Sequence, residues 1–124
     1  MKKILIVDDE PHISLIMKQH LTKAGYQVKT ALNGIQALQQ IEKELPDVIV
    51  TDIQMPKMNG IQLCDEILLE QADYKGLIII MTSRTDQDIR HWVSHFPKIK
   101  LMEKPLSLRR LTGELEEYFQ TKVE

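Results

Sequence analysis

The sequence predicts an α/β protein built on a doubly wound parallel sheet. Short apolar runs rich in Val and Ile alternate with longer segments whose apolar residues recur at helical spacing. Turn-forming residues separate these segments at Gly25, Asn33-Gly34, Pro46-Asp47, Asn59-Gly60 and Gly76. The chain has 124 residues, 43% of them hydrophobic, which is a common size for one domain with one core. We therefore expect a single domain over residues 1–124, with five strand–helix units, right-handed crossovers and helices on both faces of the sheet.

Five apolar runs predict the strands of this sheet. In chain order they are Lys3–Val7, Gln27–Ala31, Val48–Thr51, Leu77–Met81 and Lys100–Met102. Five apolar stripes predict the helices that follow them. The first three stripes are Ile13, Ile16, Met17, His20, Leu21 and Ala24, then Ile35, Leu38, Ile41 and Leu45, then Leu63, Cys64, Ile67 and Leu68. The last two are Ile89, Trp92, Val93 and Phe96, and Leu108, Leu111, Leu115, Tyr118 and Phe119.

Charge and apolar content argue against several other classes of protein. The formal net charge is -2, so the chain lacks the basic field of a nucleic-acid-binding protein, and Arg109-Arg110 is too short to provide one. We expect no direct nucleic-acid binding. The first apolar run is shorter than a signal-peptide core, and no run reaches the length of a membrane span. The single Cys64 cannot form an internal disulfide, which suits a reducing compartment, so we expect a cytoplasmic protein.

Polar residues with complementary chemistry stand at the downstream ends of four of the expected strands. Asp8 and Asp9 follow the first strand and Asp52 the third, while Thr82 follows the fourth and Lys104 the fifth. The carboxyl ends of parallel strands meet at one edge of an open α/β sheet, so these side chains are expected to converge there. Three carboxylates, a hydroxyl and an amine in one place predict a site for a cation and a phosphoryl group.

Each of these residues also has a purely structural interpretation. Asp9, two residues before Pro11, could cap the first helix. Asp52 could belong to a turn before Pro56, and Lys104 could simply end a strand. The structural interpretation needs a separate reason for each of these residues. A single site for Mg²⁺ and a phosphoryl group needs all of these residues at once. We therefore favour the site.

The chemistry expected of such a site follows from its charges. An ionised Asp52 can attack phosphorus and form an aspartyl phosphate. Three nearby carboxylates repel one another and the incoming phosphate, so a hard cation such as Mg²⁺, or Mn²⁺ in its place, is needed to offset their charge. Lys104 can pair with one phosphoryl oxygen and the Thr82 hydroxyl can donate a hydrogen bond to another.

Four motifs give the chain a resemblance to a known family. The runs ILIVDDE, VIVTDIQMPKMNG, IIIMTS and MEKP resemble the receiver domain of two-component response regulators, in particular the chemotaxis regulators. The resemblance extends from Lys3 to about Tyr118 and includes the intervals between Asp52, Thr82 and Lys104. It implies a flavodoxin-like (βα)5 fold with strand order 2-1-3-4-5.

The resemblance also implies a role for individual residues. Asp52 would be the phosphoacceptor, Asp9 a direct Mg²⁺ ligand, Asp8 an indirect one, and the backbone carbonyl of Gln54 a further ligand. Thr82 and Lys104 would sense the phosphoryl group. Pro105, following a cis Lys104-Pro105 bond, and Gly60 would be structural. The side chains of Gln54 and Arg84 would modulate the lifetime of the phosphate, and Leu101 occupies the switch position where the family usually has Tyr or Phe.

The partners implied by the resemblance are those of a signalling domain. A sensor histidine kinase or a histidine phosphotransfer protein would donate the phosphoryl group, and a downstream protein target or output domain would respond to it. A receiver homodimer could form through the fourth helix, fifth strand and fifth helix. The domain would not be an enzyme in the ordinary sense, because it would catalyse only its own phosphorylation and dephosphorylation.

Two other functions fit the predicted fold less well. An aspartate-nucleophile phosphatase of the haloacid dehalogenase type usually has a second acid two residues after the nucleophile, where this chain has Gln54. A flavodoxin-like cofactor module would place hydroxyls and amides in the loop after the first strand. That loop is acidic here, and the chain has no G-x-G-x-x-G motif.

Overall fold

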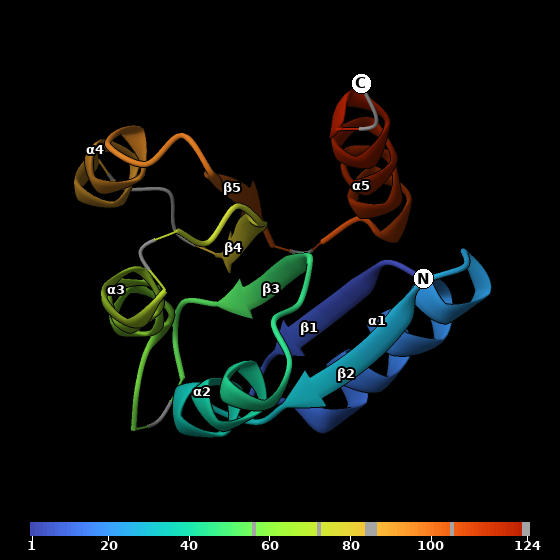
Figure 1. Ribbon diagram of the computed structural model, residues 1–124, viewed down its shortest axis with the longest axis horizontal. Helices are drawn as coiled ribbons and strands as arrows, with labels where there is room; N and C mark the ends of the chain where they lie inside the picture. Colours follow the sequence, from blue (N-terminus) through green and yellow to red (C-terminus); the bar gives the residue numbers. More distant parts are fainter. Residues whose placement is uncertain (56, 72, 84–86, 105, 123–124) are drawn as a thin grey trace.

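The computed structural model describes residues 1–55, 57–71, 73–83, 87–104 and 106–122, the side chains of 121 and 122 excepted. Its five parallel strands form one sheet in the order β2-β1-β3-β4-β5, which confirms the predicted fold (Figure 1). The strands are β1 Lys3–Val7, β2 Gln27–Ala31, β3 Val48–Asp52, β4 Leu77–Thr82 and β5 Ile99–Glu103. The helices are α1 Pro11–Lys23, α2 Gly34–Lys43, α3 Gly60–Glu70, α4 Gln87–Ser94 and α5 Leu108–Lys122.

Helices cover both faces of the sheet. The first and last helices, α1 and α5, lie on one side of the sheet, and α2, α3 and α4 lie on the other (Figure 1). Met17 and Leu21 of α1 share one buried cluster with Leu111 and Leu115 of α5. Cys64 of α3 belongs to the cluster on the opposite face, together with residues of α2. This two-sided burial explains why the strands read as continuous apolar runs.

The position of each strand in the sheet sets its burial. Every residue of the inner strands β3 and β4 is buried, while β2 and β5 at the edges mix buried and exposed residues. Strands β3 and β4 extend one residue beyond their predicted ends, so that Asp52 and Thr82 still belong to the ladder. Asp52 is paired with Met81, and Thr82 with Glu103. The sheet therefore holds these two polar residues rigidly at its carboxyl edge.

Local hydrogen bonds set where the helices on one face begin. Asn59 caps α3, since its side chain accepts a hydrogen bond from the backbone of Gln62 at 2.8 Å and the Gln62 side chain accepts one from the Asn59 N–H. Asn33 caps α2 through its Oδ1 atom, which accepts a hydrogen bond from the Gln36 N–H at 2.9 Å. The N-cap of α1 is Glu10, not Asp9, and Pro11 takes the first helical position. The structural interpretation of Asp9 as a helix cap is therefore wrong.

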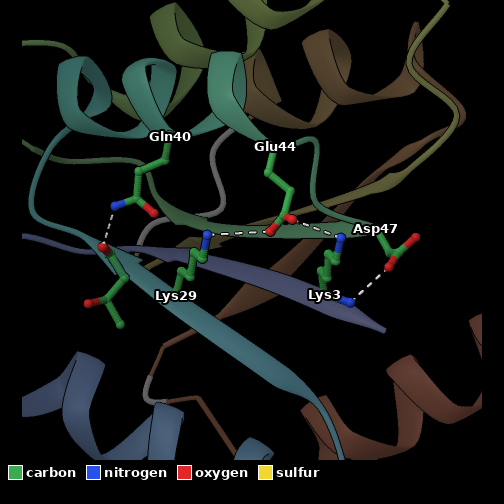
Figure 2. A network of polar contacts seen from close by, with 6 residues as sticks. Lys3, Lys29, Gln40, Glu44 and Asp47 are labelled. Atoms are coloured by element: carbon green, nitrogen blue, oxygen red, sulfur yellow. Dashed lines mark hydrogen bonds and ion pairs between the residues drawn. The ribbon is translucent and has the colours of Figure 1, made fainter. Parts of the chain in front are cut away.

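A polar network fastens the end of α2 to the two strands beneath it (Figure 2). Glu44 accepts hydrogen bonds from the ammonium groups of Lys3 at 2.9 Å and Lys29 at 3.4 Å. The Asp47 carboxylate accepts one from the backbone N–H of Lys3 at 2.8 Å, and Gln40 donates one to the Thr30 carbonyl. The network ties β1, β2 and α2 together. Lys3 begins β1 and Asp47 directly precedes β3, so these two residues lie at the amino ends of the strands, opposite the edge that carries Asp52.

The buried faces of two helices differ from the predicted apolar stripes. Ile16 of α1 is 49% exposed and Ile35 of α2 is 44% exposed, although both were expected to face the core. Ser14 is buried in place of Ile16, because the register of α1 on the sheet turns Ser14, Met17 and Leu21 inward.

Cys64 is fully buried, as expected, and burial beside Asp65 raises the pKa of its thiol to about 12. None of the helices in the described ranges has the length and apolarity needed to cross a membrane.

Candidate functional site

Asp8 is the buried member of the acidic pair. It directly follows β1, and its backbone N–H donates to the Ala31 carbonyl at 3.1 Å, which continues the pairing with β2. Its side chain is 0% exposed, and Oδ1 accepts a hydrogen bond from the Glu10 N–H at 2.9 Å. Its other oxygen, Oδ2, is buried with no hydrogen-bond partner among the described residues. A buried carboxylate oxygen without a donor is costly, which makes it a natural cation ligand.

Asp52 forms an ion pair with Lys104, the residue that directly follows β5. Its side chain is 7% exposed, and its Oδ2 atom lies 2.8 Å from Nζ of Lys104, which is 25% exposed. The backbone N–H of Lys104 donates to the Thr82 carbonyl at 2.8 Å and so fixes the base of the lysine against β4. The Gln54 N–H approaches Asp52 Oδ1 only at 3.4 Å. Asp52 is thus held by an ion pair rather than by the turn that follows it.

Thr82 completes the carboxyl edge of the sheet. It is the last residue of β4, between the strands that carry Asp52 and Lys104, and is only 2% exposed. The structure thus brings Asp8, Asp52, Thr82 and Lys104 to one edge, with Asp9 exposed beside them.

The charges at this edge perturb one another. Burial raises the pKa of the Asp8 carboxyl, the hydrogen bond from the Glu10 N–H opposes that rise, and repulsion from Asp52 adds to it. Burial lowers the pKa of Lys104, but the hydrogen bond and charge of Asp52 outweigh burial, so the net shift is upward. Lys104 therefore stays fully protonated at neutral pH. Its positive charge offsets the negative charge of Asp52 more than that of Asp8, because it forms its hydrogen bond with Asp52.

The donor set at this edge fits a hard divalent cation. One carboxylate oxygen from each of Asp8, Asp9 and Glu10 lies within 4.8 Å of the other two. A hollow of about 490 Å³ opens beside Asp9 and Gln54, and it is also lined by Asn59 of the α3 cap. Oxygen-only ligands with adjoining space for water and a phosphoryl group match the coordination that Mg²⁺ prefers. Sequence reasoning missed Glu10, although a third acid directly after Asp8-Asp9 was a visible signal.

The backbone around Asp52 leaves no room for a side chain at Gly60. A Cβ atom added there would lie 2.5 Å from the carbonyl oxygen of Asp52 and 3.0 Å from Cα of Ile53. The Gly60 N–H also donates to the Ile53 carbonyl at 2.9 Å. Lys57, in the same loop, has a positive φ of 70°, which is uncommon for a residue other than glycine. The loop after Asp52 is therefore closely constrained.

The remaining predicted residues lie farther from these contacts or outside the described ranges. Leu101 is half-buried in β5 and lines a hollow of about 540 Å³ with Arg90 and Val93 of α4 and Arg110 of α5. The Gln54 side chain is exposed. Arg84 and Pro105 lie outside the residues that the structure describes, as does Pro56.

Comparison with known sequences relates the chain to one family. A family model described as "Response regulator receiver domain" matches residues 4–116. The chain is 34% identical to the alkaline phosphatase synthesis transcriptional regulatory protein PhoP of Bacillus subtilis, over 93% of this chain and 47% of PhoP. It therefore spans about half the length of that relative. It is also 31% identical to sporulation initiation phosphotransferase F of the same organism, over 98% of this chain and 96% of that protein.

Solved structures share the fold. Chemotaxis protein CheY4 of Vibrio cholerae superposes with a TM-score of 0.86 at 28% identity, covering 94% of this chain and 98% of that chain. Response regulator protein TrrA of Thermotoga maritima, solved in complex with Mg(2+)-BeF, superposes with a TM-score of 0.80 at 31% identity and the same coverage.

Proposed function

The chain belongs to the response regulator receiver domain family, and from this membership we propose that it is a phosphorylation-controlled switch whose Asp52 accepts a phosphoryl group. The donor would be a histidine kinase or a histidine phosphotransfer protein. The observation that carries the proposal is the Asp52–Lys104 pair at 2.8 Å beside the buried Asp8. The Asp52 carboxylate, the Lys104 ammonium group and the acidic cluster that includes Asp8 and Asp9 then lie next to one another.

The transfer step follows from what these side chains can do. An Asp52 carboxylate oxygen forms a bond to phosphorus while the bond from phosphorus to the donor's histidine nitrogen breaks, and that nitrogen keeps the electron pair. Lys104 turns from the Asp52 carboxylate to an oxygen of the new phosphoryl group, so that it stabilises negative charge throughout the transfer. The Thr82 hydroxyl, at the end of the neighbouring strand, donates a hydrogen bond to another phosphoryl oxygen.

A divalent cation would be held by the acids of the same edge. Asp9 would bind it directly and Asp8 indirectly, through water, and the Gln54 backbone carbonyl and Asp52 would complete the ligand set. Receiver domains generally bind Mg²⁺ at such a cluster, and Mn²⁺ has the same preference for oxygen ligands. When bound, the cation offsets the charge of the carboxylates and of the incoming phosphate. The Mg(2+)-BeF complex of TrrA, 31% identical to this chain, supports this assignment.

Other residues would set the duration and the readout of the signal. The side chains of Gln54 and Arg84 would border the path of attacking water, and Pro105 would orient the loop after Lys104. With Leu101 at the switch position, no aromatic ring can move between rotamers there. The hydrogen bond of Thr82 and the contact of Lys104 would then supply most of the bias between the two states.

The biological setting of the chain is also part of this proposal. We place it in the cytoplasm, as one domain over residues 1–124 that catalyses only its own phosphorylation and dephosphorylation. Its output would be a downstream protein target or an attached output domain, without direct binding of nucleic acid or membrane by this domain. A homodimer through α4, β5 and α5 would present the surface around Leu101 to a second receiver.

Beryllofluoride, a mimic of the phosphoryl group, tests the site without covalent chemistry. With Mg²⁺ present it should shift the backbone amide signals of Asp52, Thr82 and Lys104 and change the fluorescence of Trp92, which packs on Phe96 with ring centres 5.1 Å apart. Thr82→Ala should reduce the fluorescence change while leaving the Asp52 shift in place. Shifts that persist after the divalent ion is chelated would contradict the proposal.

A further inference from the structure

Two histidines lie side by side at the end of α4. His91 belongs to the last turn of the helix, and His95 directly follows the helix, four residues later. Their ring centres are 4.7 Å apart with an interplanar angle of 80°, and both side chains are exposed. Because α4 ends where the chain turns back toward the start of β5, the pair lies away from the edge that carries Asp52. Two histidines four residues apart on a helix share one face and can bind the same metal ion.

A hydrogen bond determines which ring nitrogen of His95 is available to a ligand. Its Nδ1 atom lies 2.9 Å from the backbone carbonyl oxygen of His91. A carbonyl oxygen can only accept a hydrogen bond, so Nδ1 carries the proton, and in the neutral ring Nε2 keeps its lone pair. Histidines that bind metal ions commonly have this arrangement, in which one ring nitrogen donates to a carbonyl and the other binds the ion. The His95 ring is therefore in the tautomer that presents Nε2 to a metal ion.

Capping of the helix does not account for both rings. The His91 carbonyl also accepts a hydrogen bond from the Ser94 hydroxyl at 2.6 Å, so this carbonyl at the end of the helix has a donor without the His95 ring. The His91 ring makes no hydrogen bond and no ion pair within the described part of the chain, and its neighbour is the His95 ring. The charges nearby also permit a cation, because the end of a helix carries a partial negative charge and Arg90 lies 3.8 Å from the Glu103 carboxylate.

We propose that His91 and His95 form a second metal site, which binds a divalent transition-metal ion such as Zn²⁺ through one nitrogen of each ring, with water in the remaining positions. Zn–N bonds of about 2.0–2.1 Å in tetrahedral geometry place the two nitrogens roughly 3.3 Å apart. Rings whose centres are 4.7 Å apart reach this spacing by rotation of the exposed side chains. Imidazole nitrogens suit Zn²⁺, whereas the carboxylate oxygens beside Asp52 suit Mg²⁺, so the two sites select different ions.

The experiment is a titration of the chain with Zn²⁺ in excess Mg²⁺, followed by the chemical shifts of the ring nitrogens. Zn²⁺ should shift Nε2 of His95 and the ring signals of His91, while Nδ1 of His95 stays protonated. His91→Gln and His95→Gln should each raise the Zn²⁺ dissociation constant at least about ten-fold, since even the loss of a hydrogen-bond partner of a metal-bound histidine costs about 10–100-fold. His12→Gln is the matched control, because it removes an exposed histidine from the start of α1, and should leave the constant unchanged.

Thermal unfolding gives a second readout of the same site. Zn²⁺ should raise the unfolding temperature of the unaltered chain and of His12→Gln, because an ion that binds only the folded state stabilises it, and should raise that of His95→Gln much less. A Zn²⁺ constant that is unchanged in His91→Gln or in His95→Gln would overturn the proposal. A proton on Nε2 rather than Nδ1 of His95 in the metal-free chain would also overturn it, since the lone pair would then face the His91 carbonyl.

Discussion

Lys104 Nζ lies 2.8 Å from Asp52 Oδ2, an ion pair that bridges the ends of β3 and β5 across β4. The carboxylate is 7% exposed and the ammonium 25%, so water screens the pair only in part. In the function that we propose, the lysine exchanges one anionic partner for another when a phosphoryl group is added to Asp52. Such an exchange would link the chemistry of Asp52 to the position of Lys104, which directly follows β5.

Replacing Lys104 should destabilise the metal-free protein. Lys104→Met keeps the apolar part of the side chain but leaves the buried Asp52 carboxylate without its cation, which should lower the free energy of unfolding by about 1–3 kcal/mol. Urea denaturation in a chelator measures this, with Lys18→Met on the exposed face of α1 as the matched control. Added Mg²⁺ should restore part of the loss. Equal stability of Lys104→Met and Lys18→Met would mean that the ion pair is energetically unimportant.

Replacing Asp8 should have the opposite effect on stability. Asp8→Asn removes a buried charge whose Oδ2 atom has no partner among the described residues, so the metal-free variant should be more stable by about 1–2 kcal/mol. The gain should disappear in Mg²⁺, because only the unaltered protein then gains the full binding energy of the ion. Thermal unfolding with and without Mg²⁺ provides the comparison. A variant that is less stable in the chelator would contradict this reading of Asp8.

Two glycines offer a matched test of the loop after Asp52. Gly60→Ala places a Cβ atom 2.5 Å from the Asp52 carbonyl oxygen, and should cost about 2 kcal/mol or more as the backbone shifts. At Gly113 in α5 a Cβ atom meets nothing within 4 Å, so Gly113→Ala should stabilise the protein by about 0.5–1 kcal/mol. Denaturant midpoints measure both. A change of stability in the same direction for both substitutions would show that the backbone of Asp52 does not exclude a side chain at position 60.

The network around Glu44 should contribute a pH-dependent part of the stability. Hydrogen bonds from Lys3 and then Lys29 lower the pKa of Glu44 below its usual value of 4.5. Because the folded-state pKa is depressed, the contribution is present above pH 4.5 and is lost as the pH falls through the lower folded value. Glu44→Gln should thus be less stable than the parent at neutral pH, and the difference should shrink in acid. A difference that is constant across this range would exclude the linkage.

The sheet was more predictable from the sequence than the helix faces. Apolar runs located all five strands, since strands buried on both faces have few other compositions. Three of their ends were placed one residue early, before Asp52, Thr82 and Glu103, because a polar side chain does not interrupt backbone pairing. Ile16 was expected in the core and is 49% exposed, because the packing of α1 against the sheet sets its inward face more strongly than the hydrophobicity of one residue.

The members of the candidate site were predictable for a topological reason. Asp8, Asp52, Thr82 and Lys104 each stand where a strand ends, and parallel strands end at one edge. The roles of these residues stay predictions. Glu10 was not singled out, because an acid next to the first turn of a helix has an ordinary explanation in the sequence. The structure shows that the Glu10 side chain makes no capping hydrogen bond in the described part of the chain and that its carboxylate lies next to those of Asp8 and Asp9.

Phosphorylation of the chain by acetyl phosphate in the presence of Mg²⁺, followed by intact mass and by mapping of the modified peptide, is the decisive measurement for the role that we propose for Asp52. We expect one added phosphoryl group, located on Asp52, that is absent when the divalent ion is chelated. Asp52→Asn should abolish it, since the amide is no longer a nucleophile, whereas Glu70→Gln, which removes an exposed charge at the end of α3, should be labelled normally. Labelling that survives in Asp52→Asn would show that Asp52 is not the phosphoacceptor, and labelling without a divalent ion would show that no cation is required.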